Sequence, residues 1–115
     1  MTRPPLPEQF LSRFVKRGMR ERVAHEWVKK PVRLETRICH HMETLFDEKY
    51  RGVEIPLDPE SRVFVLRGED QSIRVAEVEG IGSGSLLLVA EDGSWFFAET
   101  ELMYQVPVVV WSGRI

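Results

Sequence analysis

Three side chains that can bind metals or carry protons lie close together near the middle of the chain. His40, Glu43 and Asp47 are spaced i, i+3 and i+7, which places an imidazole and two carboxylates on one face of a helix. Such a set can bind a divalent cation or transfer protons. No second segment offers an obvious set of further ligands, and Cys39 diverges from His40 because adjacent helix residues point in different directions. We therefore assign no catalytic residue, no metal and no cofactor.

His41 differs from its neighbour because it falls inside the apolar stripe of the same helical segment. We expect it to face the core. One interpretation is a neutral ring that is hydrogen-bonded to a backbone carbonyl or to a carboxylate such as Glu26. The other is a base that lines a pocket between this helix and the sheet. The second interpretation keeps a small-molecule binder or an enzyme as a further alternative for the function.

The glycine-rich segment 80–85 is the one stretch that invites a phosphate-loop interpretation. A phosphate loop follows a strand and opens a helix, whereas here a strand follows the loop. No serine of the segment stands in the G-x-S-x-G pattern of a hydrolase nucleophile. We expect a connector between strands.

Charge is divided unevenly along the chain. Residues 1–51 hold 12 Lys and Arg against 7 Asp and Glu, whereas residues 52–115 hold 4 against 11, for a net charge of −2 overall. A basic half can mark a surface that faces a polyanion. We take nucleic-acid association through the basic helices as the second hypothesis for the function, with contacts from Arg13, Lys16, Arg17 and Arg20.

The first half of the chain has helical spacing of apolar residues. Residues 1–7 are a proline-rich arm, which we expect to be untethered, and residues 8–51 form the helical half. Gly18 predicts a break, and Pro31 predicts the start of a further helix over about residues 32–50. The inward side of that helix is expected to carry Leu34, Ile38, Met42, Leu45 and Phe46.

The second half, residues 52–115, has the shorter apolar runs of strands. The predicted strands are 62–67, 73–79, 86–90, 94–99 and 106–111, and the link at Asp92-Gly93 is a strong hairpin signal. Because the links are short, we expect an antiparallel meander with residues 86–89 at its centre. The predicted fold is α+β, with two to three amino-terminal helices packed on about five strands in a single domain over residues 1–115.

The last strand supports the leading hypothesis for function. It is apolar on both faces, Pro107 places it at an edge, and the 94–99 hairpin also carries aromatic residues on both faces. We therefore expect a non-catalytic protein-binding module, such as a bacterial accessory, immunity or phage-encoded protein, that pairs with a partner or with itself as a homodimer. The expected interaction surface consists of Trp95, Val106, Val108, Val110 and Trp111.

Cysteine content and hydropathy indicate in which cellular compartment the protein is expected. Cys39 is the sole cysteine, and the chain has neither a signal-peptide pattern nor an apolar run long enough to cross a bilayer. We expect a cytoplasmic location and no contact with a membrane.

Overall fold

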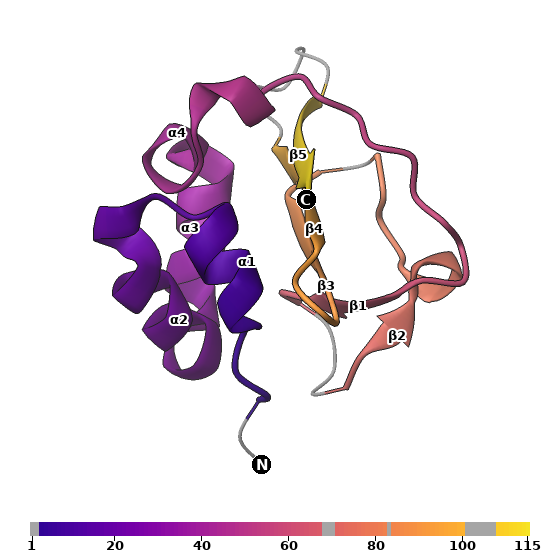
Figure 1. The fold of residues 1–115 in the computed structure, drawn as a ribbon, viewed down its shortest axis with the longest axis horizontal. Coiled ribbons are helices and arrows are strands. Elements are labelled where there is room, and N and C mark those ends of the chain that lie inside the picture. The colour runs from indigo at the N-terminus through magenta and orange to yellow at the C-terminus, as the bar shows by residue number, and fades with distance from the viewer. Residues whose placement is uncertain (1–2, 68–70, 83, 101–107) are drawn as a thin grey trace.

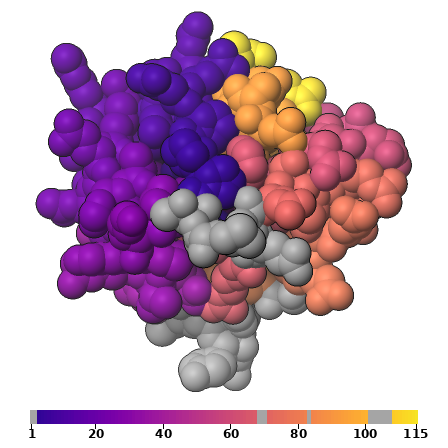
Figure 2. Space-filling model, turned by 90° about the horizontal axis from the view of Figure 1, so that it is seen from below, coloured from indigo at the N-terminus to yellow at the C-terminus, as the bar shows by residue number. Residues whose placement is uncertain are grey.

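The chain folds as the sequence predicts at the level of class: helices from its first half pack on one face of an antiparallel sheet from its second half (Figure 1). The computed structural model describes residues 3–67, 71–82, 84–100 and 108–115. Seen from a second direction, the helical half and the sheet half still occupy opposite sides of the molecule (Figure 2).

The helical half has more breaks than expected. Its α-helices are α1 (Glu8–Arg13), α2 (Arg20–Lys29), α3 (Pro31–His40) and α4 (Met42–Leu45), with 3-10 turns η1 (Arg17–Met19) and η2 (Glu48–Tyr50). The break around Gly18 and the start of α3 at Pro31 agree with the sequence.

The predicted continuous helix over residues 32–50 is wrong, because it ends at His40 and restarts at Met42. Its apolar stripe is nevertheless buried as expected. The helical path also stops after Leu45, where Val15 and Phe46 form an antiparallel bridge and the Lys16 amide donates to the Leu45 carbonyl at 2.8 Å. A continuous helix would have used these backbone groups internally.

The five strands lie in the order β2-β1-β3-β4-β5, and every neighbouring pair is antiparallel. The order is meander-like, with β3 beside β1 because the short β2 folds outward to the edge. As predicted, β3 is central and fully buried. The strands are β1 (Arg62–Val65), β2 (Ile73–Arg74), β3 (Leu86–Ala90), β4 (Trp95–Thr100) and β5 (Val109–Arg114), with the 3-10 turn η3 (Val75–Glu77) after β2.

The hairpin between β3 and β4 forms at Asp92-Gly93 as the sequence predicts. Gly93 has a φ of +76°, and its α-carbon lies so close to α1 that an added Cβ would be 2.8 Å from the Phe10 amide nitrogen. Asp92 accepts hydrogen bonds from the amide and the hydroxyl of Ser94. Glycine is therefore needed here for both its backbone conformation and its lack of a side chain.

The face of the sheet toward the helices is built around Phe96. Its ring stacks on Phe46 with centroids 4.4 Å apart, and it also contacts Phe10, Phe14 and Tyr50 at 5.9, 5.0 and 5.5 Å. These four partners come from α1, α4's carboxyl end and η2. The aromatic cluster thus joins three parts of the helical layer to one strand.

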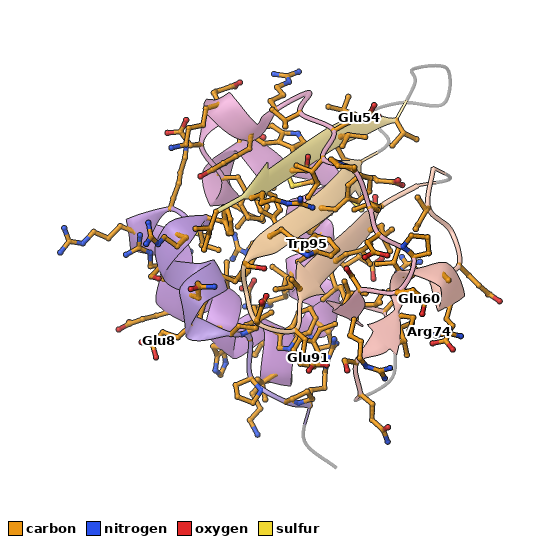
Figure 3. The ribbon with its side chains drawn as sticks, turned by 45° about the vertical axis from the view of Figure 1, so that its right-hand side comes forward. Glu8, Glu54, Glu60, Arg74, Glu91 and Trp95 are labelled. Atoms are coloured by element: carbon orange, nitrogen blue, oxygen red, sulfur yellow. The ribbon has the colours of Figure 1, made fainter. Side chains whose placement is uncertain are left out.

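The opposite face of the sheet is covered by the protein's own chain. Trp95, which lies against this face (Figure 3), and Phe97 pack in a second core with Leu88. The extended connector before β1 crosses this core and contributes Ile55 and Leu57. The aromatic residues on both faces of the β4 hairpin are therefore accounted for within one chain, without a partner.

The amino-terminal arm is docked, so the expectation of an untethered arm is wrong. Leu6 is buried, and the Trp27 indole nitrogen donates to the Pro4 carbonyl at 3.0 Å. The Arg3 guanidinium lies 4.0 Å from the centre of the Trp27 ring and donates to the carbonyls of Val65 and Leu66. The arm therefore connects α2 to the end of β1.

We predict that truncation at the centre of the sheet is costly on either face. Leu87 and Leu88 are fully buried on opposite faces of β3. Leu87→Ala and Leu88→Ala should each lower the free energy of unfolding by about 2–5 kcal/mol, measured by denaturant titration. Val32→Ala, at a side chain that is 74% exposed, is the control and should change stability little. Wild-type stability in both leucine variants would contradict the strand order.

Candidate functional site

The predicted interaction surface on the last strand is mostly inside the molecule. Trp111 is 3% exposed in the core under the helices, and Trp95 is 7% exposed in the second core. Val108 and Val110 are half-buried. Val106 lies outside the described residues. A partner cannot reach either tryptophan without rearrangement of the fold.

The outer edge of β5 is covered as well. Arg51 and Trp111 form an antiparallel bridge, and the Gly52 amide donates to the Val110 carbonyl at 2.7 Å. Ser112 accepts from the Ile55 amide at 3.1 Å and donates to the Val53 carbonyl. The segment after η2 therefore occupies hydrogen-bonding positions that a pairing strand would need.

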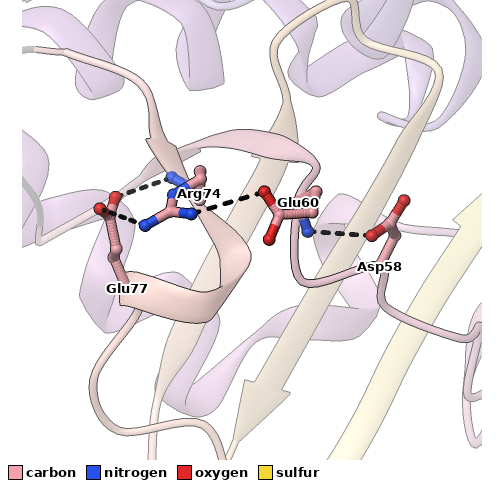
Figure 4. Close-up of polar contacts among 4 residues, drawn as sticks. All are labelled: Asp58, Glu60, Arg74 and Glu77. Carbon is pink, nitrogen blue, oxygen red and sulfur yellow. Dashed lines mark hydrogen bonds and ion pairs between the residues drawn. The ribbon is translucent and has the colours of Figure 1, made fainter.

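The other edge of the sheet is short and charged. Arg74 in the two-residue strand β2 donates to Glu77 at 3.2 Å and to Glu60 at 3.4 Å, while Asp58 accepts from the Glu60 amide (Figure 4). Short edges with charged side chains discourage pairing with other chains. In the described part of the sheet, neither edge favours strand addition.

His41 does not face the core, and the sequence expectation is wrong at this residue. It is exposed in the break between α3 and α4, where its carbonyl accepts hydrogen bonds from the amide and hydroxyl of Thr44. His40, and not His41, lines a cavity of about 150 Å³ together with Cys39 and Trp111. Ligand pockets are usually about 300–1,000 Å³, so this cavity is small for a substrate.

The break also separates His40, Glu43 and Asp47, which no longer share one helix. Among the described residues, no group of three His, Cys, Asp or Glu side chains is arranged to hold a metal ion. A larger cleft of about 600 Å³ lies beside the glycine segment, with Val65 and Leu86 in its lining. The guanidinium on this cleft, that of Arg67, is already paired with Glu35.

The predicted polyanion contacts divide into two pairs. Arg20 donates to the carbonyls of Val15 and Ser12, and Lys16 donates to the Glu43 carbonyl at 2.7 Å, so both hold the backbone around η1. Arg13 and Arg17 are exposed. Only the second pair is therefore available to an external anion without loss of an internal contact.

A further group of arginines surrounds Glu26, which sequence reasoning considered only as a partner for His41. Glu26 is 3% exposed, and Arg37 donates to both of its carboxylate oxygens at 2.7 and 3.0 Å. The hydrogen bonds from Arg37, followed by the charges of Arg37, Arg22 and Arg33, lower the pKa of Glu26 against the opposing effect of burial. One guanidinium, that of Arg37, therefore contacts this buried carboxylate, and the charges of Arg22 and Arg33 act on it from the same two helices.

Glu99 is a second buried carboxylate that the sequence interpretation missed. It is 1% exposed on β4, and both of its oxygens accept from the Gly82 amide, at 2.7 and 2.9 Å. Burial raises its pKa, opposed by this hydrogen bond. The sequence contained a signal for this burial, because alternate residues of a strand share one face and Glu99 therefore lies on the same face of β4 as Trp95 and Phe97. Its visible role is to tie the glycine segment to the sheet.

Comparisons with known protein families, with curated proteins and with solved structures find no match to this chain. Within the described ranges, no helix has the length and apolarity needed to cross a membrane. Function must therefore be argued from the surface and the charges of the chain itself.

We predict a pH dependence from Glu99. Because burial raises its pKa, the folded state holds this proton more tightly than the unfolded chain. The resulting stabilisation is present below pH 4.5, the ordinary pKa of a glutamate, and is lost as the pH rises through the raised value. The Glu99→Gln variant has no carboxyl group at this position and should not lose this stabilisation. The free energy of unfolding of the variant, relative to that of wild type, should therefore increase from pH 4.5 to about 7.

Denaturant titrations of both proteins across this range measure the difference. The carboxylates with lowered pKa, such as Glu26 and Asp92, act in the opposite sense but are common to both proteins and cancel. Glu54→Gln, at an exposed side chain, is the matched control. An equal pH profile for wild type and Glu99→Gln would show that the Glu99 carboxylate is not desolvated.

We also predict that Glu26 stabilises the helical layer. Glu26→Gln keeps the size of the side chain but leaves Arg37 and its neighbours without their counter-charge. The variant should lose about 2 kcal/mol of stability, and added salt should recover part of the loss by screening the remaining arginines. Thermal melts at low and high salt check both statements, and a loss that salt does not reduce would argue against repulsion.

Proposed function

We propose that this protein is a non-catalytic binding module that docks an anionic partner through the outer side of its helical layer. The observation that carries the proposal is a set of exposed cations between α1 and the start of α3. These cations are Arg13, Arg17, Arg22, Lys29, Lys30 and Arg33. Within the described part of the chain, their side chains make no hydrogen bond and no ion pair.

Between α1 and the start of α3, the segment that carries these cations, the exposed acids do not balance this charge. In α1, η1 and α2, the exposed carboxylates are Glu8 and Glu21, since Glu26 is buried and paired. The acidic residues of the sequence gather on the sheet half, where Glu54, Glu60 and Glu91 mark that side in Figure 3. The molecule measures 38 × 32 × 27 Å, several times the Debye length of about 8 Å at physiological salt. An anion at the helices is therefore screened from much of the acidic side.

We keep the protein-binding hypothesis but place the binding surface on the helical layer and not on the last strand. Pairing through the last strand, with a partner or as a homodimer, is poorly supported because Trp95 and Trp111 are buried and the β5 edge is covered. The basic helical layer supports docking of either an acidic protein or a nucleic acid. A cytoplasmic location, where both kinds of partner occur, belongs to the same proposal.

We predict salt-dependent retention on anionic matrices. At about 50 mM salt the wild-type chain should be retained on heparin or on immobilised polyglutamate, and retention should fall steeply by about 200 mM. Arg17→Glu combined with Lys29→Glu, both at exposed side chains, should abolish retention at the lower salt.

The matched control reverses two exposed cations that lie away from α1, η1, α2 and the start of α3, Lys49→Glu with Arg114→Glu. It changes the net charge equally and should leave most of the retention intact. Retention lost equally in both variants would show that net charge, and not this surface, governs binding. A wild-type chain that neither matrix retains would end the proposal.

A further inference from the structure

Arg22, Arg33 and Arg37 differ from the other cations of the helical layer because they lie on the two helices that the Glu26 carboxylate joins and because their charges act on it. Arg37 is fixed by its two hydrogen bonds to Glu26, a contact that joins α3 to α2. Arg22 lies one helical turn before Glu26 on α2, and Arg33 lies one turn before Arg37 on α3. Both are close enough for their charges to act on the Glu26 carboxylate. The contact between Glu26 and Arg37 therefore joins the two helices that carry Arg22 and Arg33.

Arg22, Arg33 and Arg37 together carry more positive charge than Glu26 neutralises. Glu26 carries one negative charge and is fully engaged by Arg37, so Arg22 and Arg33 remain without an anion at ion-pair distance in the described residues. Lys29 is seven residues after Arg22, or two turns, and lies on the same side of α2. Arg22, Lys29 and Arg33 are all exposed. We call these three residues the arginine face.

We infer that the arginine face binds the phosphate backbone of double-stranded nucleic acid without regard to sequence. This inference rests on the proposed function and names the partner class. Guanidinium groups match phosphate oxygens with paired hydrogen bonds, and they are less strongly hydrated than ammonium groups. A duplex also presents about one charge per 1.7 Å of its axis, so it can engage several clustered cations at once.

The choice of duplex backbone over bases follows from the side chains that this surface lacks. The large apolar side chains exposed in the described residues are Val32, Val53, Ile81 and Ile115, and none is aromatic. Proteins that bind single strands stack bases on exposed aromatic rings. Without such rings, contacts to phosphate account for the binding, and a single strand should bind no better than a duplex of equal length.

The test is fluorescence anisotropy with a labelled duplex of random sequence, about 20 base pairs long, and with labelled polyglutamate of similar length. Between about 50 and 200 mM salt, the logarithm of the duplex affinity should fall linearly with the logarithm of salt. Arg22→Gln with Arg33→Gln removes two phosphate contacts. It should reduce the steepness of that line by about 2 and weaken duplex binding at least about tenfold at the lower salt.

Lys49→Gln with Arg114→Gln removes the same charge elsewhere and should leave the slope unchanged. Far-UV circular dichroism and a thermal melt check that both variants are folded. If the duplex binds but the Arg22 and Arg33 variant keeps the wild-type slope, the arginine face is not the site. If polyglutamate binds and the duplex does not, the inference fails while the proposed function stands, and if neither binds, both fail.

Discussion

The contact of Phe96 with the helical layer is the constraint on which the rest of the structure depends. Four aromatic rings from separate parts of the first half meet this one side chain. The register of the sheet makes room for them, because Phe96 pairs with Gly113 across β4 and β5. A Cβ at Gly113 would lie 2.7 Å from the Tyr50 ring. Phe46 follows directly after α4, and its ring stacks on Phe96.

The self-covered sheet determines where a partner can act. Its helix face is filled by the aromatic cluster, its opposite face by the connector with Ile55 and Leu57, and the edge of β5 by the segment around Gly52. These surfaces stabilise the fold and are therefore covered, so a partner cannot reach them. The exposed cations of α1, η1, α2 and the start of α3 do not pack against the sheet, so they remain available to a partner.

The sequence predicted the features that depend on neighbours along the chain. The two halves, the central β3, the helix start at Pro31 and the hairpin at Asp92-Gly93 follow from periodicity and turn chemistry. The features that it missed depend on residues far away. His41 continues the apolar spacing of its helix, and that spacing does not show that α3 ends at His40 or that Phe46 forms a bridge with Val15. In the same way, the contact between Glu26 on α2 and Arg37 on α3 joins two helices, and spacing within one helix cannot reveal it.

The position of Phe96 in the sequence has a consequence for biosynthesis. Residues 10–50 are synthesised before β4, so Phe10, Phe14 and Phe46 lack their central partner during that interval. Contacts between such distant segments slow folding and leave apolar surface open to association. The final packing of the helical half therefore waits for the last strands to be synthesised.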